Sequence, residues 1–421
     1  MCLTLKKTKS NKQLKNLNHW NSDQIVDGRC YHQAVNFLGI SSIPRDQGDP
    51  LRTVKKQTYI NDQDTLEGFV NKATGSLWIA VDTEFERVRT FYPKLCLIQI
   101  AIPGHSVCVD PLVDLDLTPL CRLFEDPGTL KIFHSARQDL EVLQHSLGVT
   151  LSNIFDTQVA AALTGYGDQI GYGHLVKEIC DVQLSKAFTR TPWGRRPLTD
   201  DEILYAMDDV EYLDDLYAHL LEMLEKTSRT TWLTEECSAL VSRDLSGNDP
   251  VAIEKVVKAC RKFDRTTQSV AHALARWREE RARRKDRPRE WLLGTSVIVS
   301  LAQMRPKMLN ALDSIQDLEP GTIKYQGEQI LKTIREGENA APSFKPLSLS
   351  PQQDAETKAL GNRLWKHLGE LCESASIPTS LVARRDDIRA LAGGRLDLRL
   401  MSGWRKEFAG ELLSKIALGT K

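Results

Sequence analysis

The sequence predicts an α/β domain over residues 57–225, followed by a region made of helices alone. Short apolar runs of strand type occur at 77–81, 95–102 and 130–133, and segments with helical periodicity follow them. From about residue 226 the strand signals disappear, and Ala, Leu, Arg and Glu become abundant in a helical pattern. Strands that alternate with helices indicate a sheet with covered faces and some parallel pairs, and the later pattern indicates all-α domains.

Charge divides the chain in the same way as the secondary-structure pattern. Residues 1–56 carry a net charge of +6, residues 57–225 a net charge of −15, and residues 226–421 a net charge of +9. Concentrated carboxylates can bind cations, and basic flanking segments can bind a polyanion. Ordinary solvated surface charge would produce the same totals, so the gradient suggests a division of labour without proving it.

Residues 1–56 are expected to be a basic, flexible extension, because lysines precede any acid and 41–50 is rich in Pro, Gly, Asp and Ser. No apolar run follows the N-terminal charges, so no secretory signal is expected. No stretch of about 18 apolar residues exists, so no membrane span is expected. The nine cysteines form no C-x-x-C pair, which excludes the signatures of zinc ribbons and thioredoxins. Reduced thiols in a cytoplasmic protein are the expectation.

Within the α/β domain, the runs at 77–81, 95–102 and 107–109 lie so close together that an antiparallel meander is expected. A short helix is predicted over 119–124, with Thr118 as its N-terminal cap. A second helix is predicted after the strand at 130–133, with Ser135 as its cap.

Three groups of residues carry candidate chemistry. Asp82 and Glu84 end an apolar strand, and a strand's period of two places them on the same face. Their like charges repel unless a cation neutralises them, and oxygen-only clusters suit Mg²⁺ or Mn²⁺. Asp139 lies in the first turns of the helix after 130–133, where an acid that only complements the helix dipole is the simpler interpretation.

The third group lies on a predicted helix at 204–213. Tyr205 and Asp209 are four residues apart, so they share a face, and a tyrosine there could orient an attacking water. Asp208 is the competing ligand, but it projects in another direction. An exposed acidic helix face is the alternative interpretation, which the neighbouring Asp214 and Asp215 favour.

In this order and context the three groups resemble the motifs of the ribonuclease D family, in the DEDD exonuclease superfamily. A tyrosine four positions before the last aspartate marks one subclass, and Leu204 excludes the histidine subclass. The C-terminal region resembles the HRDC helical domains that this family shares with RecQ-type helicases. The matching segments are Val81-Asp82-Thr83-Glu84-Phe85, Leu97-Ile98-Gln99, His134 through Asp139, Tyr205 with Asp209-Val210, Arg384 through Ile388, and Gly403-Trp404-Arg405.

The resemblance implies an RNase H-like catalytic domain over 57–225 and HRDC-like domains over 226–338 and 339–421. It also implies two divalent cations, Mg²⁺ or Mn²⁺, of which Asp82 would bridge both. Glu84 and Asp209 would complete one site, Asp139 would hold the other, and Tyr205 would orient the water. Candidate substrate contacts are Thr83, Phe85, Gln99 and His134.

The expected activity is 3′→5′ exoribonuclease action on RNA with a single-stranded 3′ end, and the resemblance suggests tRNA precursors as substrates. A monomer is expected, because no long heptad pattern is visible. Two alternatives remain open. A DNA-directed 3′→5′ exonuclease would use the same metal chemistry, since only contacts to the 2′-hydroxyl separate the substrates. A non-catalytic nucleic-acid-binding scaffold would need only the fold.

Overall fold

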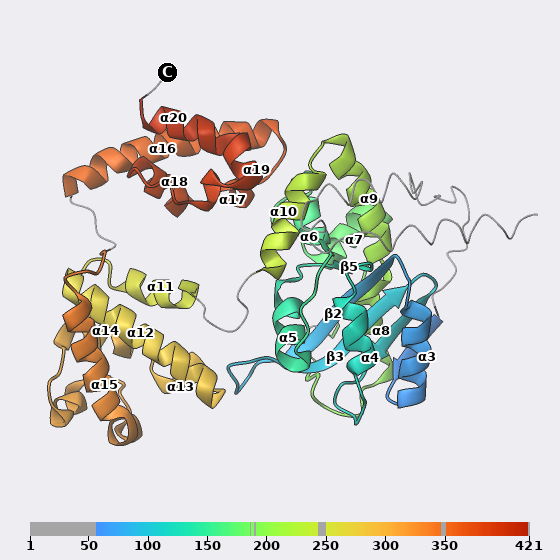
Figure 1. Cartoon of the computed structure of the whole chain (residues 1–421), viewed down its shortest axis with the longest axis horizontal. Helices are drawn as coiled ribbons and strands as arrows, with labels where there is room; N and C mark the ends of the chain where they lie inside the picture. The colour runs from blue at the N-terminus through green and yellow to red at the C-terminus, as the bar shows by residue number, and fades with distance from the viewer. Residues whose placement is uncertain (1–55, 186, 189–190, 243–249, 347–350, 420–421) are drawn as a thin grey trace, which may run out of the picture. The chain divides into compact units, whose positions relative to one another are not determined.

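The computed structural model describes residues 56–185, 187–188, 191–242, 250–346 and 351–419, so the expected extension lies outside the described residues except for Lys56. Its α/β part contains a six-stranded sheet in the order β1-β4-β3-β2-β5-β6 (Figure 1). The strands are β1 (Lys56–Ile60), β2 (Trp78–Glu86), β3 (Lys94–Ile102), β4 (His105–Val109), β5 (Leu130–Phe133) and β6 (Ile154–Asp156).

The centre of the sheet is the expected antiparallel meander. β2 pairs antiparallel with β3, and β3 pairs antiparallel with β4 through a two-residue turn, in which Gly104 adopts a φ of +75°. The outer pairs are parallel: β1 with β4, β5 with β2, and β6 with β5. The mixed sheet with flanking helices confirms the predicted fold class, although the sequence interpretation did not single out β1 or β6.

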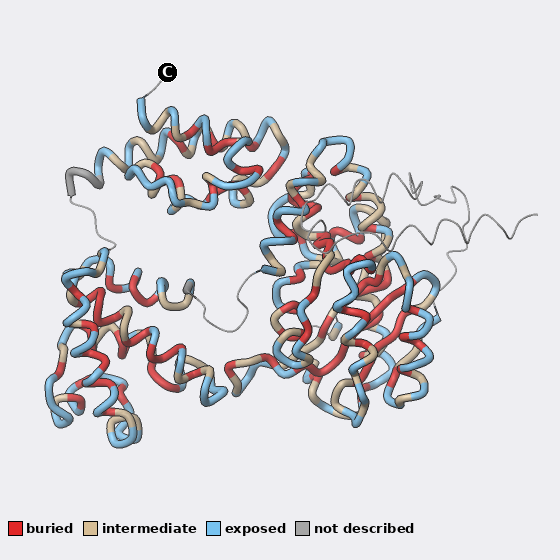
Figure 2. The backbone as a smooth tube through the Cα atoms, in the orientation of Figure 1, coloured by how far each residue is buried: buried red, intermediate tan, exposed pale blue. Residues whose placement is uncertain are grey.

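The two faces of the sheet are buried by different helices. Ile98 and Ile100 of β3 pack in the main core with Leu140 of α5 (Arg137–Leu147). Leu97, on the opposite face of β3, packs in a second cluster with Ala206 of α8 (Asp200–Glu211). Figure 2 shows the resulting continuous burial of the central strands. The face beneath α8 is the one onto which Asp82 and Glu84 project, since both alternate with the buried Val81 and Thr83.

Both predicted helix caps are wrong. Thr118 is the first residue of α4 (Thr118–Glu125), and its N–H donates to the Asp116 carboxylate at 2.9 Å. Ser135 lies before α5 in the left-handed region, with a φ of 64°. The buried carboxylate of Asp156 accepts hydrogen bonds from the N–H groups of Ser135 and Ala136, at 3.1 and 2.9 Å. A carboxylate from β6 therefore does what a local hydroxyl was expected to do.

Further helices belong to this part of the chain. α6 (Thr157–Leu163) begins directly after Asp156, and its Gln158 and Val159 N–H groups also donate to that carboxylate. α7 (Tyr172–Cys180) follows. α9 (Leu213–Lys226) continues from α8, and α10 (Thr230–Val241) packs against β6 and α6.

The first helical domain contains α11 (Pro250–Ala259), α12 (Arg265–Lys285), α13 (Arg289–Leu292), α14 (Thr295–Met304), the 3-10 turn η3 (Leu309–Ser314) and α15 (Pro320–Ala340). α12 and α15 cross closely at Gly337, where an added Cβ would lie 2.6 Å from the Cα atom of Val270. The Ser269 hydroxyl donates to the Gly337 carbonyl at 2.7 Å across the same crossing. Only glycine permits this approach of two backbones.

The second helical domain contains α16 (Pro351–Ser374), α17 (Thr379–Val382), α18 (Arg385–Ala392), η4 (Arg399–Met401), α19 (Gly403–Arg405), η5 (Lys406–Gly410) and α20 (Glu411–Ala417). Trp404 and Arg405 of the HRDC-like segment are both buried, and the Arg405 guanidinium donates to the Leu381 carbonyl at 2.9 and 2.7 Å. No described helix has the length and apolar character that crossing a membrane requires. The seven cysteines in the described ranges are free thiols.

We expect Asp156→Ala to lower the free energy of unfolding by at least about 2 kcal/mol, because it removes the acceptor for four N–H groups at two helix starts. Asp116→Ala is the matched control, since this exposed carboxylate accepts from one N–H group at the start of α4 and should cost about 1 kcal/mol or less. Urea unfolding of both variants measures the difference. Equal losses would contradict the role given to Asp156.

Candidate active site

Asp82 and Glu84 lie at the point where β2 passes from the buried core toward the surface. The strand begins with the buried residues Ile79, Ala80 and Val81, and its exposure then rises at Asp82 and Glu84, which are both half-buried. Asp82 lies directly opposite Gln99 of β3, and Glu84 lies opposite Leu97. The register shifts immediately after Glu84, so the strand bends away once the second acid is placed. The sequence pattern of an apolar run ending in Asp-x-Glu therefore delivers two carboxylates to one face.

The α8 helix brings Tyr205 and Asp209 over that face. Its start is fixed by a capping box, in which Thr199 and Glu202 exchange hydrogen bonds with each other's backbone N–H groups. Arg195 also binds Glu202 through two contacts of 2.6 and 2.8 Å. This cap fixes the rotation of the helix and therefore the direction of both functional side chains.

The end of α8 is fixed by a buried tyrosine. The Tyr172 hydroxyl donates to the Asp208 carbonyl at 2.8 Å and accepts from the Tyr212 N–H at 3.2 Å. It thus replaces the helical hydrogen bonds lost at the break between α8 and α9, next to Asp209. Burial, followed by the nearby charge of Asp209, raises the pKa of Tyr172, so the hydroxyl stays protonated.

Asp139 lies on α5, which is the third element that contributes to the site, after β2 and α8. Its side chain is buried, and its Oδ1 atom accepts a 2.5 Å hydrogen bond from the Thr83 hydroxyl. Thr83 lies between Asp82 and Glu84 on β2, so this bond ties the helix to the strand at the site. The interpretation of Asp139 as a simple dipole partner is insufficient, because the carboxylate is buried beside other acids.

Burial raises the pKa of all four acids, and charges from within the set add to this effect for Asp82, Glu84 and Asp209. Burial first, and then the charges of Asp139 and Asp209, raise the pKa of Glu84 from 4.5 to about 8. Burial raises the pKa of Asp139 to about 7, and burial with the charges of Asp208 and Asp139 does the same for Asp209. Burial and the charges of the other three raise the pKa of Asp82 well above its usual value. The four carboxyls therefore face one space, with Asp82 at the centre of the repulsion.

This donor set fits hard divalent cations, since it consists of carboxylate oxygens whose repulsion a cation would relieve. In the structure as it stands, no three His, Cys, Asp or Glu side chains of the described ranges converge closely enough to form a coordinating group. Both observations hold together, because electrostatic influence extends further than a metal–oxygen bond. The four carboxyls face the same space, but they do not come close enough together to form a coordinating group.

Tyr205 is held between two aromatic rings. Its ring centroid lies 5.7 Å from that of Phe188 and 6.5 Å from that of Trp193. Burial, followed by the charges of Asp209 and Glu84, raises the pKa of Tyr205 to about 12. The phenol is therefore a hydrogen-bond donor beside the acids at neutral pH.

The candidate substrate contacts lie in different environments. His134 is half-buried, and its two ring nitrogens contact Thr157 Oγ1 at 2.9 Å and the Ile170 carbonyl at 3.0 Å. Thr83 already donates to Asp139. Phe85 is half-buried at the end of β2, whereas Gln99 has no exposed surface. Sequence reasoning did not single out Tyr172 or the capping role of Asp156, because both act across distant parts of the chain.

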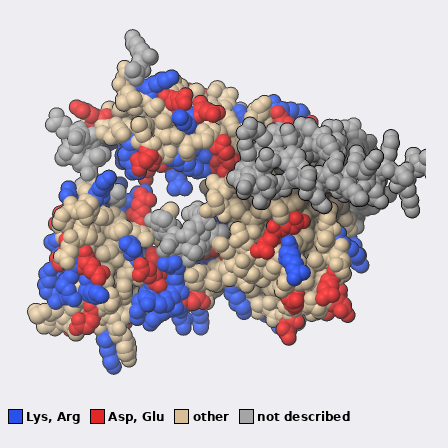
Figure 3. Space-filling view, in the orientation of Figure 1, with Lys and Arg blue, Asp and Glu red and all other residues tan. Residues whose placement is uncertain are grey.

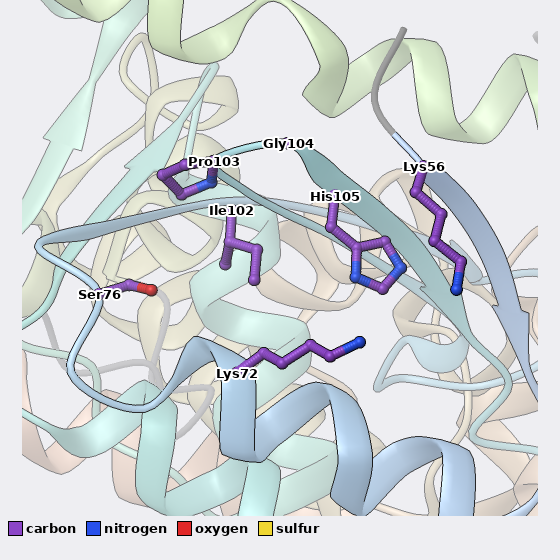
Figure 4. A pocket seen from close by; sticks show the side chains of 7 residues that line it. All are labelled: Lys56, Lys72, Ser76, Ile102, Pro103, Gly104 and His105. Carbon is purple, nitrogen blue, oxygen red and sulfur yellow. The ribbon is translucent and has the colours of Figure 1, made fainter. Parts of the chain in front are cut away.

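Two cavities of the described structure are lined by none of the four acids. One of about 440 Å³ is lined by residues of β1, α3 (Gln63–Ala73) and the β3–β4 turn, including Lys56, Lys72 and His105 (Figure 4). The turn follows Ile102, the last residue of β3, which lies three residues beyond Gln99. None of its lining residues belongs to the predicted site, so this basic cavity has no part in the arrangement described above.

A run of basic residues from Arg276 to Arg289, accompanied by Trp277 and Trp291, lies on α12 and α13, but only part of it is on the surface. Arg278 is buried, and its guanidinium donates to Glu290, Thr295 and the Leu293 carbonyl. Arg289 binds the buried Glu279 at 2.7 Å. Figure 3 shows that many Lys and Arg side chains nevertheless remain on the surface of this domain. Of the two tryptophans, Trp291 is 59% exposed and available for stacking, whereas Trp277 is buried.

Comparison with known proteins decides the family. A family model for 3′–5′ exonucleases matches residues 57–225, and an HRDC model matches residues 267–334. Ribonuclease D of Jannaschia sp. is 35% identical over 377 residues, covering 86% of this chain and 97% of the relative. Ribonuclease D of Gluconacetobacter diazotrophicus is 34% identical over 360 residues, covering 84% and 90%. The chain belongs to the ribonuclease D family.

The structural comparison agrees. The crystal structure of Escherichia coli RNase D, described as an exoribonuclease involved in structured RNA processing, matches with a TM-score of 0.74 and 28% identity, covering 86% of this chain and 98% of that one. This member of the ribonuclease D family is accordingly a 3′→5′ exoribonuclease with a DEDD catalytic domain and a helical HRDC region. The DEDD family typically uses divalent metal ions. The expected fold, family and activity are confirmed.

The raised pKa values predict an unusual pH dependence of stability for this ribonuclease D relative without metal. Between the usual pKa near 4.5 and the value of about 8 for Glu84, the folded state holds protons that the unfolded chain has released. The free energy of unfolding in EDTA should therefore fall as pH rises through this window.

Chemical denaturation in EDTA, from about pH 5 to about pH 9, measures this fall. Glu84→Gln should flatten it, and Mn²⁺ should oppose it by neutralising the carboxylates. An equally steep fall in Glu84→Gln would contradict the assignment of the raised pKa.

Proposed function

We propose that this exoribonuclease hydrolyses RNA from the 3′ end with two divalent cations, Mg²⁺ or Mn²⁺, held by Asp82, Glu84, Asp139 and Asp209. The observation that carries the proposal is the convergence of four carboxyls from β2, α5 and α8 on one space. Burial raises the pKa of each, and charges from within the set raise it further for Asp82, Glu84 and Asp209. Such repulsion destabilises the metal-free fold, so it points to positive charge at the centre when the enzyme is loaded.

The electrostatics supports the division of roles. Asp82 is influenced by all three other acids, as a carboxylate between two cations would be. The charge of Asp209 raises the pKa of Glu84, and these two acids would hold one cation together with Asp82, whereas Asp139, anchored by Thr83, would hold the other. Asp208 is absent from the charges that raise the pKa of Asp82, which favours Asp209 as the ligand. Bound there, two cations would stabilise negative charge on the attacking and leaving oxygens of the phosphodiester.

Tyr205 would orient the attacking water by a hydrogen bond. Its phenol is protonated at neutral pH, and Phe188 and Trp193 restrict the ring. Because the hydroxyl lies near Asp209 and Glu84, it can contact a water at the cation that these two acids would share. A positioned donor of this kind contributes by geometry and by stabilising charge that develops in the transition state.

Among the four candidate substrate residues, Phe85 is the one we propose to contact the terminal nucleotide by stacking, because it is partly exposed. Thr83 and His134 have their polar atoms engaged by the protein, so they would shape the site around the nucleotide. The basic helical surface would hold the RNA backbone without reading its sequence. We also propose that the substrates are tRNA precursors and that the protein is a cytoplasmic monomer. The proposed domain limits are 57–225, 226–338 and 339–421.

Asp82→Asn and Asp209→Asn are expected to abolish degradation of RNA while leaving the fold intact, since each keeps the shape of the side chain and removes a ligand charge. A 5′-labelled single-stranded RNA and its DNA counterpart, incubated with Mn²⁺ or Mg²⁺, provide the assay. The wild-type protein should give a stepwise ladder on RNA and a much weaker one on DNA.

Asp208→Asn is the matched control for that assay and should retain activity. A near wild-type rate in Asp82→Asn or Asp209→Asn would contradict the ligand assignment. Loss of activity in Asp208→Asn with activity kept in Asp209→Asn would exchange the roles of these neighbours.

Tyr205→Phe should lower kcat about 10²-fold or more while leaving Mn²⁺ affinity close to that of the wild type, because it removes one hydroxyl and keeps the ring between its neighbours. Single-turnover kinetics and Mn²⁺ titration separate the two quantities. A large loss of Mn²⁺ affinity would show instead that the hydroxyl supports the metal site.

A further inference from the structure

The buried amide of Gln99 is a polar group of the catalytic domain that the mechanism above does not use. Gln99 lies in the centre of β3 with no exposed surface. Neither its Nε2 nor its Oε1 atom has a hydrogen-bond partner in the described part of the chain. A buried amide without partners destabilises a fold, and such groups are rare unless a function retains them.

The residues that lie opposite Gln99 in the sheet indicate which group its amide can contact. Asp82 of β2 lies directly opposite on one side, and Cys108 of β4 lies directly opposite on the other. Directly opposed residues place their side chains on the same face of a sheet, with Cβ atoms about 4.5–5.5 Å apart. The amide therefore stands in a row with the central acid of the site, beneath α8. Cys108 is a weak partner, and its thiol contacts the Ile203 carbonyl at 3.9 Å.

Two groups at this position lack the interactions that they could make. The four carboxyls share one space without closing into a coordinating group. The amide beside the central acid has no partner. If the Asp82 carboxylate turned toward bound cations, the carboxyls could act as ligands and the amide could gain a partner. A carboxylate oxygen has more than one lone pair, so it can still accept a hydrogen bond from a donor at its side.

We propose that Gln99 is a positioning residue whose side-chain N–H donates to the Asp82 carboxylate in the metal-loaded enzyme and fixes its orientation between the cations. The inference rests on the metal site proposed above. It differs from the sequence-based expectation that Gln99 contacts substrate, since a residue without exposed surface lies beneath the acids rather than beside the RNA. Partners that orient metal ligands commonly change metal affinity about 10–100-fold when they are removed.

Gln99→Met tests the proposal, because methionine keeps the length and buried volume of the side chain and removes both polar atoms. In EDTA the variant should unfold at a higher temperature than the wild type, since an unpartnered amide has been replaced by an apolar group. With metal the effect should reverse: Mn²⁺ affinity, measured by calorimetry, should fall about tenfold or more. kcat should fall with it, while KM for RNA changes little.

Leu97→Met is the matched control, since Leu97 is also fully buried on the same face of β3. It should leave Mn²⁺ affinity within about twofold of the wild type, because hydrophobic replacements of similar volume perturb a core least. Wild-type protein that binds no Mn²⁺ would refute the metal site itself. Wild-type binding together with unchanged binding in Gln99→Met would refute only the role of Gln99.

Two further outcomes also overturn the inference. A lower unfolding temperature of Gln99→Met in EDTA, or failure of this variant to fold, would show that the amide already has a partner without metal. A raised KM for RNA with unchanged Mn²⁺ affinity would return Gln99 to the role of a substrate contact.

Discussion

The mutual repulsion of four carboxylates in one half-buried space is the constraint on which the rest of the catalytic domain depends. Left free, Asp82, Glu84, Asp139 and Asp209 would turn toward water or take up protons, and their raised pKa values record that tendency. A fold can keep them together only by fixing the backbone that carries each one. The sheet, α5 and α8 do this, because each contributes its acid from a segment with a buried apolar face.

The fixing groups are themselves polar and buried. Asp156 holds the starts of α5 and α6, the capping box of Thr199 and Glu202 sets the start of α8, and Tyr172 spans the break after Asp209. Each supplies a hydrogen bond that the helix lacks at that point. Such groups tolerate little change, since removing one partner leaves buried N–H or carbonyl groups unsatisfied. Precision at the site therefore rests on residues that never contact the substrate.

The helical region is stabilised in a different way from the catalytic domain. Its first domain is built on apolar helix packing, with a close crossing at Gly337 that only glycine allows. Part of its arginine content is structural: Arg278 and Arg289 bind buried or neighbouring acids. Other Lys and Arg side chains lie on the surface of this domain, and holding a polyanion through their charge would require less exact geometry than catalysis. On the function proposed above, the acidic catalytic domain would bind the metal ions and the basic helical region would hold the substrate.

The sequence by itself determined the strands of the meander, the helical character of the described residues after 226, and the candidate acids. Local patterns suffice there, because period two places Asp82 and Glu84 on one face and a spacing of four places Tyr205 and Asp209 on another. Tertiary structure alone decided that Asp156 rather than Ser135 caps α5, that Tyr172 supports Asp209, and that Gln99 is buried without a partner beside Asp82. These facts join residues that are distant in the chain, and hydrogen bonds across such distances depend on the packed sheet and helices, which no local pattern encodes.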